Sequence, residues 1–342
     1  MIKTLTSWRG IFALCIVCFH FGMHAFDQMT FAGVTFFFML SGYLVTFRNS
    51  NVAAVKQFYR RRLLRIFPLH WLVLAAMIAV DLALMHKFHY GWDLPLHVAL
   101  LQSWIPDVDV IYNYSIHSWF LSSLVFCVIA TPLLLKFLDK ASRKVAWGVI
   151  IAACVTVAVI NVNANEQWHS YLYVCPVTRL VDYALGMLLG TTMRERATTR
   201  HTSIARATIH ELVPLAVLSA FVAFHASGNS VAQQLEHSVL WWLPVSLLLM
   251  QSTVLNGNEG LIGKLLSLRP LVWLGEISFE IYILQKLVNN LFCYAVAPFF
   301  GHFKIFIYDY SFACTIPMLI FTAWLVSRLL SQTIAKRLKK NQ

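Results

Sequence analysis

The sequence has few charged residues. Only 12% of its 342 residues are Asp, Glu, Lys or Arg, whereas 59% are hydrophobic. So little charge, with a mean hydropathy of +0.67, excludes an ordinary soluble domain. No stretch is long and polar enough to form a separate soluble unit, so we expect a single membrane domain over residues 1–342. The composition therefore indicates an all-α polytopic membrane protein.

Acidic residues and cysteines are also scarce. The chain has 15 Asp and Glu against 27 Lys and Arg, a formal net charge of +12. The basic residues stand in short loops between apolar runs, so the positive-inside rule explains the excess and we expect no nucleic-acid partner. The seven cysteines are spread singly, which indicates neither a disulfide framework nor a zinc cluster, and we expect no metal. Six of them fall in apolar runs and are interpreted as small buried hydrophobes: Cys15, Cys18, Cys127, Cys154, Cys293 and Cys314.

Apolar runs of about 20 residues, the length that crosses a bilayer, predict about ten transmembrane helices. The predicted spans are 5–27, 30–47, 66–86, 117–136, 145–161, 175–193, 209–226, 236–255, 271–296 and 308–332. The stretch from Leu94 to Ile105 is too short to span, and we expect a partial or re-entrant segment buried against protein. The first run has no small-residue cleavage site after it, so we expect a retained signal anchor.

The basic residues also predict the orientation. With the N-terminus in the cytoplasm, nearly all loop Lys and Arg residues fall on the inner side, and only Lys87 and Lys304 remain for the outer loops. This asymmetry predicts an even number of spans with both termini cytoplasmic.

The first predicted span carries Arg9 and His20 in an otherwise apolar segment. At about 100° per residue, their offset places both on nearly the same helix face, about 16 Å apart along the axis. A charge in lipid is costly, so we expect these side chains, and His24 one turn further out, to face an internal cavity. An arginine near the cytoplasmic end can hold an anion, and a histidine deeper in the membrane can act as a base.

A second cluster, Arg61, Arg62 and Arg65, precedes the third predicted span. In a helical turn, spacings of three and four would concentrate these cations on one surface. One interpretation is topogenic charge that also binds anionic lipid. The use of arginine throughout favours the other interpretation, recognition of phosphate by bidentate guanidinium groups.

Polar residues also interrupt three later spans. Arg179 and Asp182, three apart in the sixth span, are expected to form a structural ion pair. The Ser41–Gly42 pair predicts a kink or a close approach of another helix. The ninth span holds enough polar groups to predict a lined interior, with Glu276, Glu280, Gln285 and Lys286.

Five motifs follow one another along the chain. They are Arg9-x10-His20, Phe37-Phe38-Met39-Leu40-Ser41-Gly42-Tyr43, Arg61-Arg62-x-x-Arg65-Ile66-x-Pro68, Trp119-Phe120-Leu121-Ser122 and Leu274-Gly275-Glu276-Ile277-Ser278-Phe279-x-Ile281-Tyr282. In this order and spacing, the sequence resembles the membrane acyltransferase-3 family over essentially its whole length.

The resemblance implies a ten-helix membrane enzyme that moves an acyl group, usually acetyl from cytoplasmic acetyl-CoA, to a sugar hydroxyl of a surface glycan or its lipid-linked precursor. It implies that His20 is the essential base and Arg9 its companion; we add His24 as a reserve base. Acetyl-CoA is the expected co-substrate, with expected contacts from Arg61, Arg62, Arg65, Ser41 and Tyr43. Acceptor contacts are expected from Trp119, Glu276, Ser278, Tyr282 and Gln285. The expected setting is the bacterial inner membrane, with membrane lipids, acetyl-CoA and a saccharide acceptor as partners.

The chain departs from the commoner family pattern at three positions. Thr35, Leu124 and Gln285 stand where an acidic residue, a Glu and a His are common in the family. If those groups contact the acceptor in relatives, acceptor choice differs here. The Arg9–His20 pair is intact, so the expected reaction type is unchanged. No esterase-like domain is expected outside the membrane, which implies that one membrane module completes the transfer.

An alternative from a different class is a carrier or flippase for an anionic glycolipid, in which arginines bind phosphate and His20 couples protons. Broken helices and two similar halves would favour such a carrier. The sequence predicts neither feature, which favours acyl transfer. Two routes are open for His20 in that transfer, direct base catalysis and a transient acyl-histidine.

Overall fold

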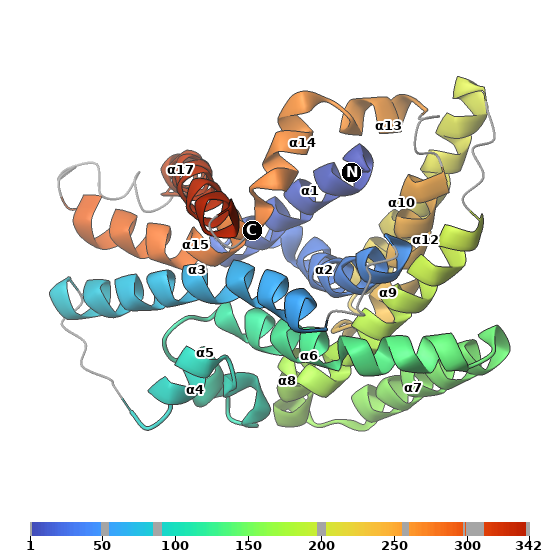
Figure 1. The fold of residues 1–342 in the computed structure, drawn as a ribbon, viewed down its shortest axis with the longest axis horizontal. Coiled ribbons are helices and arrows are strands. Elements are labelled where there is room, and N and C mark those ends of the chain that lie inside the picture. The colour runs from blue at the N-terminus through green and yellow to red at the C-terminus, as the bar shows by residue number, and fades with distance from the viewer. Residues whose placement is uncertain are drawn as a thin grey trace.

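The computed structural model describes residues 2–48, 55–84, 91–196, 203–254, 260–296, 298 and 311–339, and these ranges contain helices and no strand (Figure 1). The expected outer-loop residues Lys87 and Lys304 lie outside the described residues. The fold is therefore all-α, as the composition predicts.

The longer helices form the body of the protein. They are α1 (Lys3–His20), α2 (Asp27–Phe47), α3 (Val55–Ala83), α6 (Ser118–Lys140), α7 (Arg143–Asn163), α8 (Glu166–Val174), α9 (Pro176–Arg196), α10 (Ile204–Ala226), α12 (Val239–Val254), α14 (Arg269–Glu276), α15 (Ser278–Leu291) and α17 (Ser311–Lys339). Shorter elements connect them: η1 (His24–Phe26), α4 (Leu94–Ala99), η2 (Gln102–Trp104), α5 (Val108–Tyr112), α11 (Ser230–Gln234), α13 (Leu261–Leu266) and the π-helical η3 (Phe292–Val296).

Six helices in the described ranges are long and apolar enough to cross a membrane, and the bent pair α8 and α9 makes a seventh if counted as one span. The six are His24–Phe47, Val55–Ala83, Ser118–Lys140, Arg143–Asn163, Ile204–Ala226 and Phe312–Leu330. The chain is thus a polytopic membrane protein. The expected total of ten spans stays a prediction, because α12 is short and the ninth expected span is divided into α14 and α15.

The centre of the protein is formed by α2 with α1 and α9 beside it (Figure 1). At Gly42 the two helices α2 and α9 come so close that a Cβ atom would collide with the carbonyl oxygen of Tyr183. Thr46 Oγ1 also donates to the carbonyl oxygen of Met187, 2.7 Å away on α9. The close approach predicted for the Ser41–Gly42 pair is confirmed, as small residues commonly permit between membrane helices.

Apolar side chains also face outward, most clearly on α7 and α10. Val149, Val155 and Val159 on α7 and Ile209 and Leu212 on α10 are exposed. Such a surface is unfavourable in water and suits contact with lipid acyl chains. These helices therefore form part of the lipid-facing perimeter.

The first span ends earlier than predicted. Instead of reaching residue 27, α1 stops at His20, and Gly22 adopts a φ of +81°. A left-handed residue just after a helix terminates it, and glycine has no Cβ to oppose that conformation. His24 therefore belongs to the separate turn η1 and does not continue the face of Arg9 and His20.

The third helix begins much earlier than the expected residue 66. Because α3 starts at Val55, the arginine cluster lies within a helix rather than in a loop. The same helix continues through Pro68, which membrane helices tolerate. The sequence places these arginines in a loop, because charged residues mark the end of an apolar run. The helical backbone, however, extends beyond the apolar run.

The expectation of unbroken helices is wrong at two places. The predicted span 271–296 is divided at Ile277, where α14 ends and α15 begins. Ser278 Oγ donates to the carbonyl oxygen of Gly275, 2.9 Å away, and so satisfies a backbone group at the end of α14. A second break separates α8 from α9, whose axes are bent by 50°.

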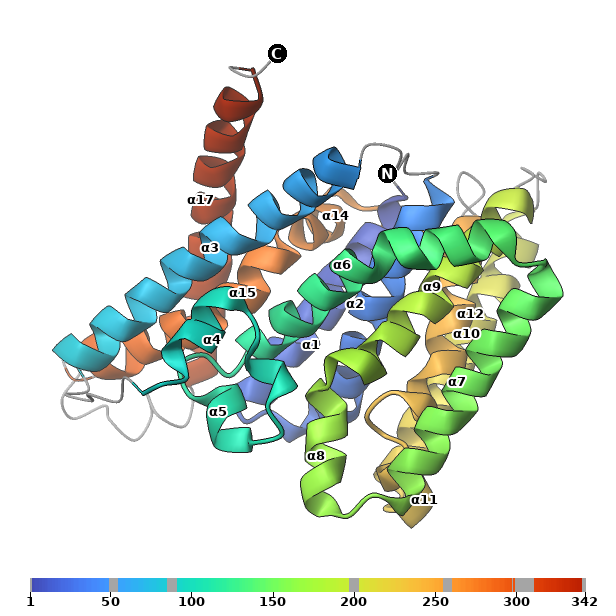
Figure 2. The same cartoon turned by 60° about the horizontal axis from the view of Figure 1, so that its bottom comes forward.

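The segment from Leu94 to Ile105 is confirmed as partial rather than spanning. It forms the six-residue helix α4 and the turn η2, which pack beside α3 and α6 (Figure 2). His70 Nε2 on α3 donates to the carbonyl oxygen of His97, and His97 Nε2 donates to that of Val110, each over 2.7 Å. These two bonds tie the segment into the protein.

All seven cysteines carry free thiols, so no disulfide forms among them. Cys15, Cys18 and Cys127 are buried as predicted. The same expectation is wrong for Cys314, which is exposed, and only partly met by Cys154 and Cys293, which are half-buried. An apolar run in a membrane protein faces lipid on one side, so membership of such a run does not ensure burial within protein.

The start of α1 and the end of α17 lie toward the same side of the molecule in Figure 2. The first turns of α3 and α7 point to that side as well, whereas α4, α5, α8 and α11 lie toward the opposite side. This arrangement has the two-sided form that the basic residues predict. The assignment of the first side to the cytoplasm stays a prediction.

Candidate functional site

A cavity lies among α1, α2, α3, α6, α9 and α15. Its empty volume is about 960 Å³, which includes space open to solvent. Apolar groups such as Phe37, Leu40 and Phe120 form most of the wall. Its polar groups are Arg9, Ser41, Arg62, Arg65, Tyr183, Ser278 and Tyr282.

Three guanidinium groups face this cavity, from Arg9 on α1 and from Arg62 and Arg65 on α3. Arg65 interacts electrostatically with both of the others, and like charges at short range repel. The buried carboxyl of Glu280 offsets part of this charge through its interactions with Arg9 and Arg65. The cavity keeps an excess of positive charge, and a bound anion would relieve the repulsion.

His20 lies at the other end of α1, beyond the cavity wall. Its ring meets the ring of His117 edge to face, with centroids 4.3 Å apart. The hydroxyl of Tyr282, a cavity residue, donates to the carbonyl oxygen of His117 over 3.0 Å. Arg9 therefore lines the cavity as predicted, but His20 does not, and Tyr282 with His117 connects the cavity to it.

The charge of Lys286 acts on this pair of histidines. Lys286 on α15 interacts electrostatically with both His20 and His117. His20 is half-buried, whereas His117 is buried, and neither ring nitrogen of His117 has a hydrogen-bond partner among the described residues. The arrangement supplies two imidazoles and one cation, groups that can move protons and stabilise a developing negative charge.

Of the other predicted site residues, the structure brings Ser41, Ser278 and Tyr282 to the cavity. Ser41 Oγ donates to the carbonyl oxygen of Phe37 over 2.7 Å, as a serine within a helix commonly does. The predicted site residues that line the cavity therefore come from α1, α2, α3 and α15.

Three predicted residues are exposed and lie away from the cavity wall. His24 has an exposed side chain whose Nδ1 lies 3.4 Å from Asp27 Oδ2. Arg61 and Glu276 are exposed as well. On α3, the helix turn that places Arg62 and Arg65 at the cavity turns Arg61 away from it.

Three further predicted residues are buried elsewhere. The Tyr43 hydroxyl lies 2.6 Å from Thr253 Oγ1, between α2 and α12. Trp119 packs against Tyr173, with ring centroids 4.9 Å apart. Gln285 is fully buried and donates to the carbonyl oxygen of Tyr282, 2.9 Å away, so it lies just behind a cavity residue.

The three departures from the family pattern occupy different positions. Leu124 lines the cavity. Thr35 is buried and its hydroxyl has no hydrogen-bond partner among the described residues, and the Oε1 atom of Gln285 also has none. Of the three substitutions, the one at Leu124 alters the cavity wall directly.

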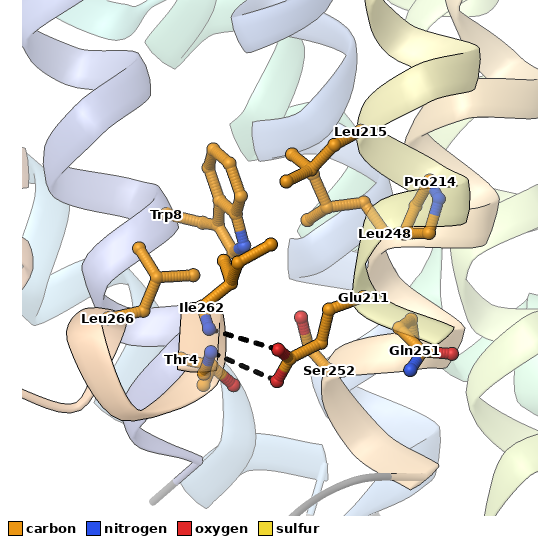
Figure 3. Close-up of a pocket in the computed structure, with 11 residues that line it drawn as sticks. Thr4, Trp8, Glu211, Pro214, Leu215, Leu248, Gln251, Ser252, Ile262 and Leu266 are labelled. Atoms are coloured by element: carbon orange, nitrogen blue, oxygen red, sulfur yellow. Dashed lines mark hydrogen bonds between the residues drawn. The ribbon is translucent and has the colours of Figure 1, made fainter. Parts of the chain in front are cut away.

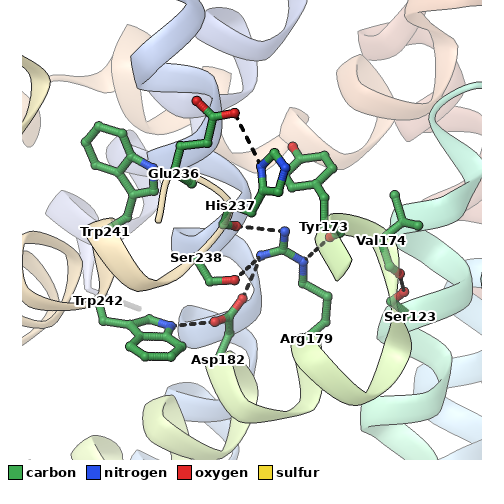
Figure 4. Close-up of polar contacts among 10 residues, drawn as sticks. All are labelled: Ser123, Tyr173, Val174, Arg179, Asp182, Glu236, His237, Ser238, Trp241 and Trp242. Carbon is green, nitrogen blue, oxygen red and sulfur yellow. Dashed lines mark hydrogen bonds and ion pairs between the residues drawn. The ribbon is translucent and has the colours of Figure 1, made fainter. Parts of the chain in front are cut away.

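The predicted ion pair between Arg179 and Asp182 is confirmed. Arg179 Nη1 lies 2.8 Å from Asp182 Oδ2, and both side chains are fully buried (Figure 4). Trp242 Nε1 donates to Asp182 Oδ1 over 2.5 Å, and Arg179 Nη2 donates to the carbonyl oxygen of His237 over 2.8 Å. These contacts join α9 to the start of α12, which is a structural role.

A second, smaller pocket of about 400 Å³ lies between α1, α10, α12 and α13 (Figure 3). Its carboxylate, Glu211, accepts hydrogen bonds from the backbone N–H groups of Gly260, Ile262 and Gly263. The carboxylate is thereby committed to capping the start of α13. This pocket offers no free charged group for chemistry.

Sequence reasoning assigned no role to His117. It stands two residues before Trp119, at the start of an apolar span, and its partner His20 is far away along the chain. An ionisable residue at the entry of a membrane helix was the available signal. The partner could not be found without the fold.

The acyltransferase domain family matches the chain over residues 2–335. The acyltransferase MdmB of Streptomyces mycarofaciens is 26% identical over 324 residues, covering 84% of this chain and 79% of that protein. The peptidoglycan O-acetyltransferase OatA of Listeria monocytogenes is 20% identical over 317 residues, covering 82% of this chain and 48% of that protein. No solved structure matches the chain.

Proposed function

Because the chain belongs to the acyltransferase-3 family and is an O-acyltransferase of the membrane, we propose that it acylates a hydroxyl of a cell-surface saccharide or its lipid-linked precursor. The proposed donor is cytoplasmic acyl-CoA, with acetyl as the acyl group. The proposed setting is the bacterial inner membrane. The observation that carries this proposal is the gathering of Arg9, Arg62 and Arg65 around one cavity whose far wall, Tyr282, contacts His117 beside His20.

The donor would bind from the side of the arginines. Coenzyme A carries several phosphate groups, and guanidinium groups recognise phosphate through paired hydrogen bonds. Arg62 and Arg65 lie near the start of α3 and would hold these phosphates. Arg9 would hold the carbonyl or the thioester arm further in. Arg61 faces outward, so its proposed contact with the nucleotide depends on a ligand that extends beyond the cavity.

The acceptor would approach from the side of His20. Arg9 and His20 are about 16 Å apart along α1, a distance of the same order as an extended pantetheine arm. The nucleotide can then stay on the inner side while the thioester reaches toward the histidines. Half-buried His20, at the end of α1 opposite the N-terminus, remains accessible to a second substrate.

In the direct route, the acceptor oxygen forms a bond to the carbonyl carbon while His20 accepts the hydroxyl proton. The carbon–sulfur bond then breaks, and the CoA thiolate takes up a proton, which the histidine can return. In the second route, His20 attacks the carbonyl carbon first, CoA leaves, and the acyl-histidine transfers its group to the hydroxyl. The proposal assigns no metal to either route.

The acceptor would be bound by residues around Tyr282. Ser278 and Tyr282 line the cavity, and Gln285 lies directly behind Tyr282. Leu124 adds an apolar contact where the family commonly has Glu. We therefore propose that the acceptor presents a less polar surface at this point than the acceptors of relatives with the carboxylate.

One observation favours the alternative, carriage of an anionic glycolipid. The helix breaks at Ile277 and between α8 and α9 are features of carriers, although the sequence has no two similar halves. The membership of the acyltransferase family outweighs this observation.

The test is turnover by the purified protein. With acetyl-CoA and candidate glycans, release of CoA should depend on the acceptor, and mass spectrometry should find an acetylated saccharide. His20→Ala should lower the rate by about 10²–10⁴-fold, the usual effect of removing a base. His210→Ala, a change at an exposed residue of α10, is the matched control and should retain activity. Movement of glycolipid between leaflets without acyl transfer would support the carrier instead.

A further inference from the structure

A cluster of potential metal ligands lies away from the cavity, where α8 meets the segment between α11 and α12. His169 on α8 and Glu236 and His237 in that segment each offer one ligand atom, and these atoms lie within 4.8 Å of one another. Glu236 Oε1 is 3.7 Å from His237 Nδ1, and the two side chains face each other in Figure 4. In a tetrahedral zinc site with bonds of about 2.1 Å, neighbouring ligand atoms are about 3.4 Å apart. Small movements of these side chains would therefore suffice.

A hydrogen bond to the backbone orients the ring of His169, as is common for histidines that bind metals. Its Nε2 lies 2.8 Å from the carbonyl oxygen of Gln234. A carbonyl oxygen only accepts, so Nε2 of His169 carries the proton and Nδ1 keeps its lone pair. Metal-binding histidines commonly donate their second N–H to a carbonyl or carboxylate in this way.

Glu236 is held by a similar outer contact. Its Oε2 lies 2.5 Å from Nε2 of His225, near the end of α10. The second oxygen, Oε1, is left facing His237 at a distance too long for a hydrogen bond. A carboxylate fixed through one oxygen and open at the other is the usual state of a ligating carboxylate.

His237 is buried and its Nδ1 has no hydrogen-bond partner among the described residues. Its ring lies between those of His169 and Tyr173, at centroid distances of 4.0 and 4.8 Å. A buried nitrogen without a partner costs free energy, and a metal ion would remove that cost. The three residues thus bring their candidate ligand atoms within 4.8 Å of one another, one of them from a buried side chain.

The nearby positive charge of Arg179 is already compensated. Arg179 donates to the carbonyl oxygen of His237, so its guanidinium lies close to the cluster. Its ion pair with Asp182 neutralises it, and Glu236 supplies a further negative charge. Two imidazoles with one carboxylate are the ligands of borderline metals such as zinc rather than of magnesium or calcium.

We propose that His169, Glu236 and His237 bind one zinc ion, with the fourth position left to water. The site is separate from the cavity, because none of its three ligand residues lines that cavity. The metal would join α8 to the segment before α12 and so fix the helix bend that precedes α9. The proposed acyl transfer does not pass through this ion.

The test uses the full-length protein purified in detergent through an affinity tag that contains no histidine. After treatment with EDTA and equilibration with micromolar zinc chloride, elemental analysis should find one zinc per chain, and competition with a coloured chelator gives the Kd. His169→Ala and Glu236→Gln should each weaken zinc binding by about 100-fold or more, a larger effect than the loss of an outer contact. His210→Ala, an exposed histidine on α10, should bind zinc as the unaltered protein does.

A thermal measurement separates lost binding from a misfolded variant. Zinc should raise the Tm of the unaltered protein and of His210→Ala, because a ligand that binds the folded state stabilises it. It should not raise the Tm of Glu236→Gln, which nearly preserves the side-chain volume and should still unfold cooperatively. An unaltered protein that takes up no zinc, or variants that bind it equally, would overturn the proposal. These measurements do not depend on enzyme activity.

Discussion

The rings of His20 and His117 meet edge to face, 4.3 Å between centroids, although one ends α1 and the other precedes α6. The contact brings together two ionisable side chains that are far apart along the chain. It gives His20, the proposed base, a neighbouring imidazole.

The first prediction concerns that neighbour. His117→Phe keeps an aromatic ring in the packing with His20 and Tyr282 but removes both nitrogens. We expect kcat to fall by about 10²-fold, with KM for acetyl-CoA nearly unchanged, because the change affects proton movement rather than donor binding. Steady-state kinetics with varied acetyl-CoA measure both constants. An unchanged kcat would mean that the ring of His117 serves only to pack.

The arginine cluster provides an internal comparison. Arg62→Ala or Arg65→Ala should raise KM for acetyl-CoA by about tenfold, whereas Arg61→Ala should change it less than about twofold, because Arg61 faces outward. Measuring KM with acetyl-3′-dephospho-CoA as well shows which arginine contacts the 3′-phosphate, since its variant should lose the preference for the complete donor. Equal effects at all three positions would point to general surface charge instead.

The buried ion pair of Arg179 and Asp182 should be sensitive to the loss of one partner. Asp182→Asn leaves the guanidinium without its counter-charge in a fully buried site, which costs about 3–5 kcal/mol. The Tm in detergent should fall accordingly. Arg179→Met combined with Asp182→Leu should recover part of the loss, because no charge is then left unpaired. A single variant as stable as the unaltered protein would contradict the structural role.

The close approach of α2 and α9 predicts a matched pair of glycine variants. Gly42→Ala places a Cβ against the carbonyl oxygen of Tyr183, and we expect a cost of about 1–3 kcal/mol from the forced separation of the helices. Gly148→Ala on α7 meets no atom within 4 Å and should be neutral or stabilising by up to about 1 kcal/mol. Thermal unfolding of the two variants tests the difference.

The partial segment should make the protein sensitive to mild acid. Burial lowers the pKa of His97 below its ordinary value of 6.5, despite a hydrogen bond to Val110 and the charge of Asp93, which both act in the opposite direction. The unfolded chain therefore binds a proton more readily than the folded protein. Stability from this residue is present above about pH 6.5 and is lost as the pH falls toward the lower folded pKa.

His97→Gln tests this dependence. The variant should be less stable at pH 7.5, because the imidazole packing is lost, yet its Tm should fall less between pH 7.5 and pH 5.5 than that of the unaltered protein. Thermal scans at both pH values measure the difference. An equal fall in both proteins would show that other groups cause the acid sensitivity.

The sequence predicted the features that depend on local pattern. Hydropathy identified most long helices, and the costs of membrane charge correctly predicted the Arg179–Asp182 pair and a polar cavity at Arg9. Helix ends were predicted less well. Helix α3 begins at Val55, before the apolar run starts. The break between α14 and α15 at Ile277 has no proline at that position to mark it in the sequence.

Features that depend on contacts between distant segments could not be predicted. The pairing of His20 with His117, and of His169 with Glu236 and His237, requires the packing of helices that are remote in sequence. The offset between Arg9 and His20 also predicted one shared cavity, whereas the cavity is lined by Arg9 and not by His20, which is linked to the cavity residue Tyr282 through His117. A periodicity shows which face a residue occupies and not which side chains fill that face.

The position of Tyr282 has a consequence for the timing of the proposed reaction. Its ring forms part of the cavity wall. Its hydroxyl donates a hydrogen bond to the carbonyl oxygen of His117, whose ring contacts that of His20. In the proposed reaction a thioester in the cavity reaches His20 past this ring, and we expect the Tyr282 side chain to move aside. Each turnover of the proposed reaction would then include a movement of the Tyr282 side chain, a conformational step in addition to the making and breaking of bonds.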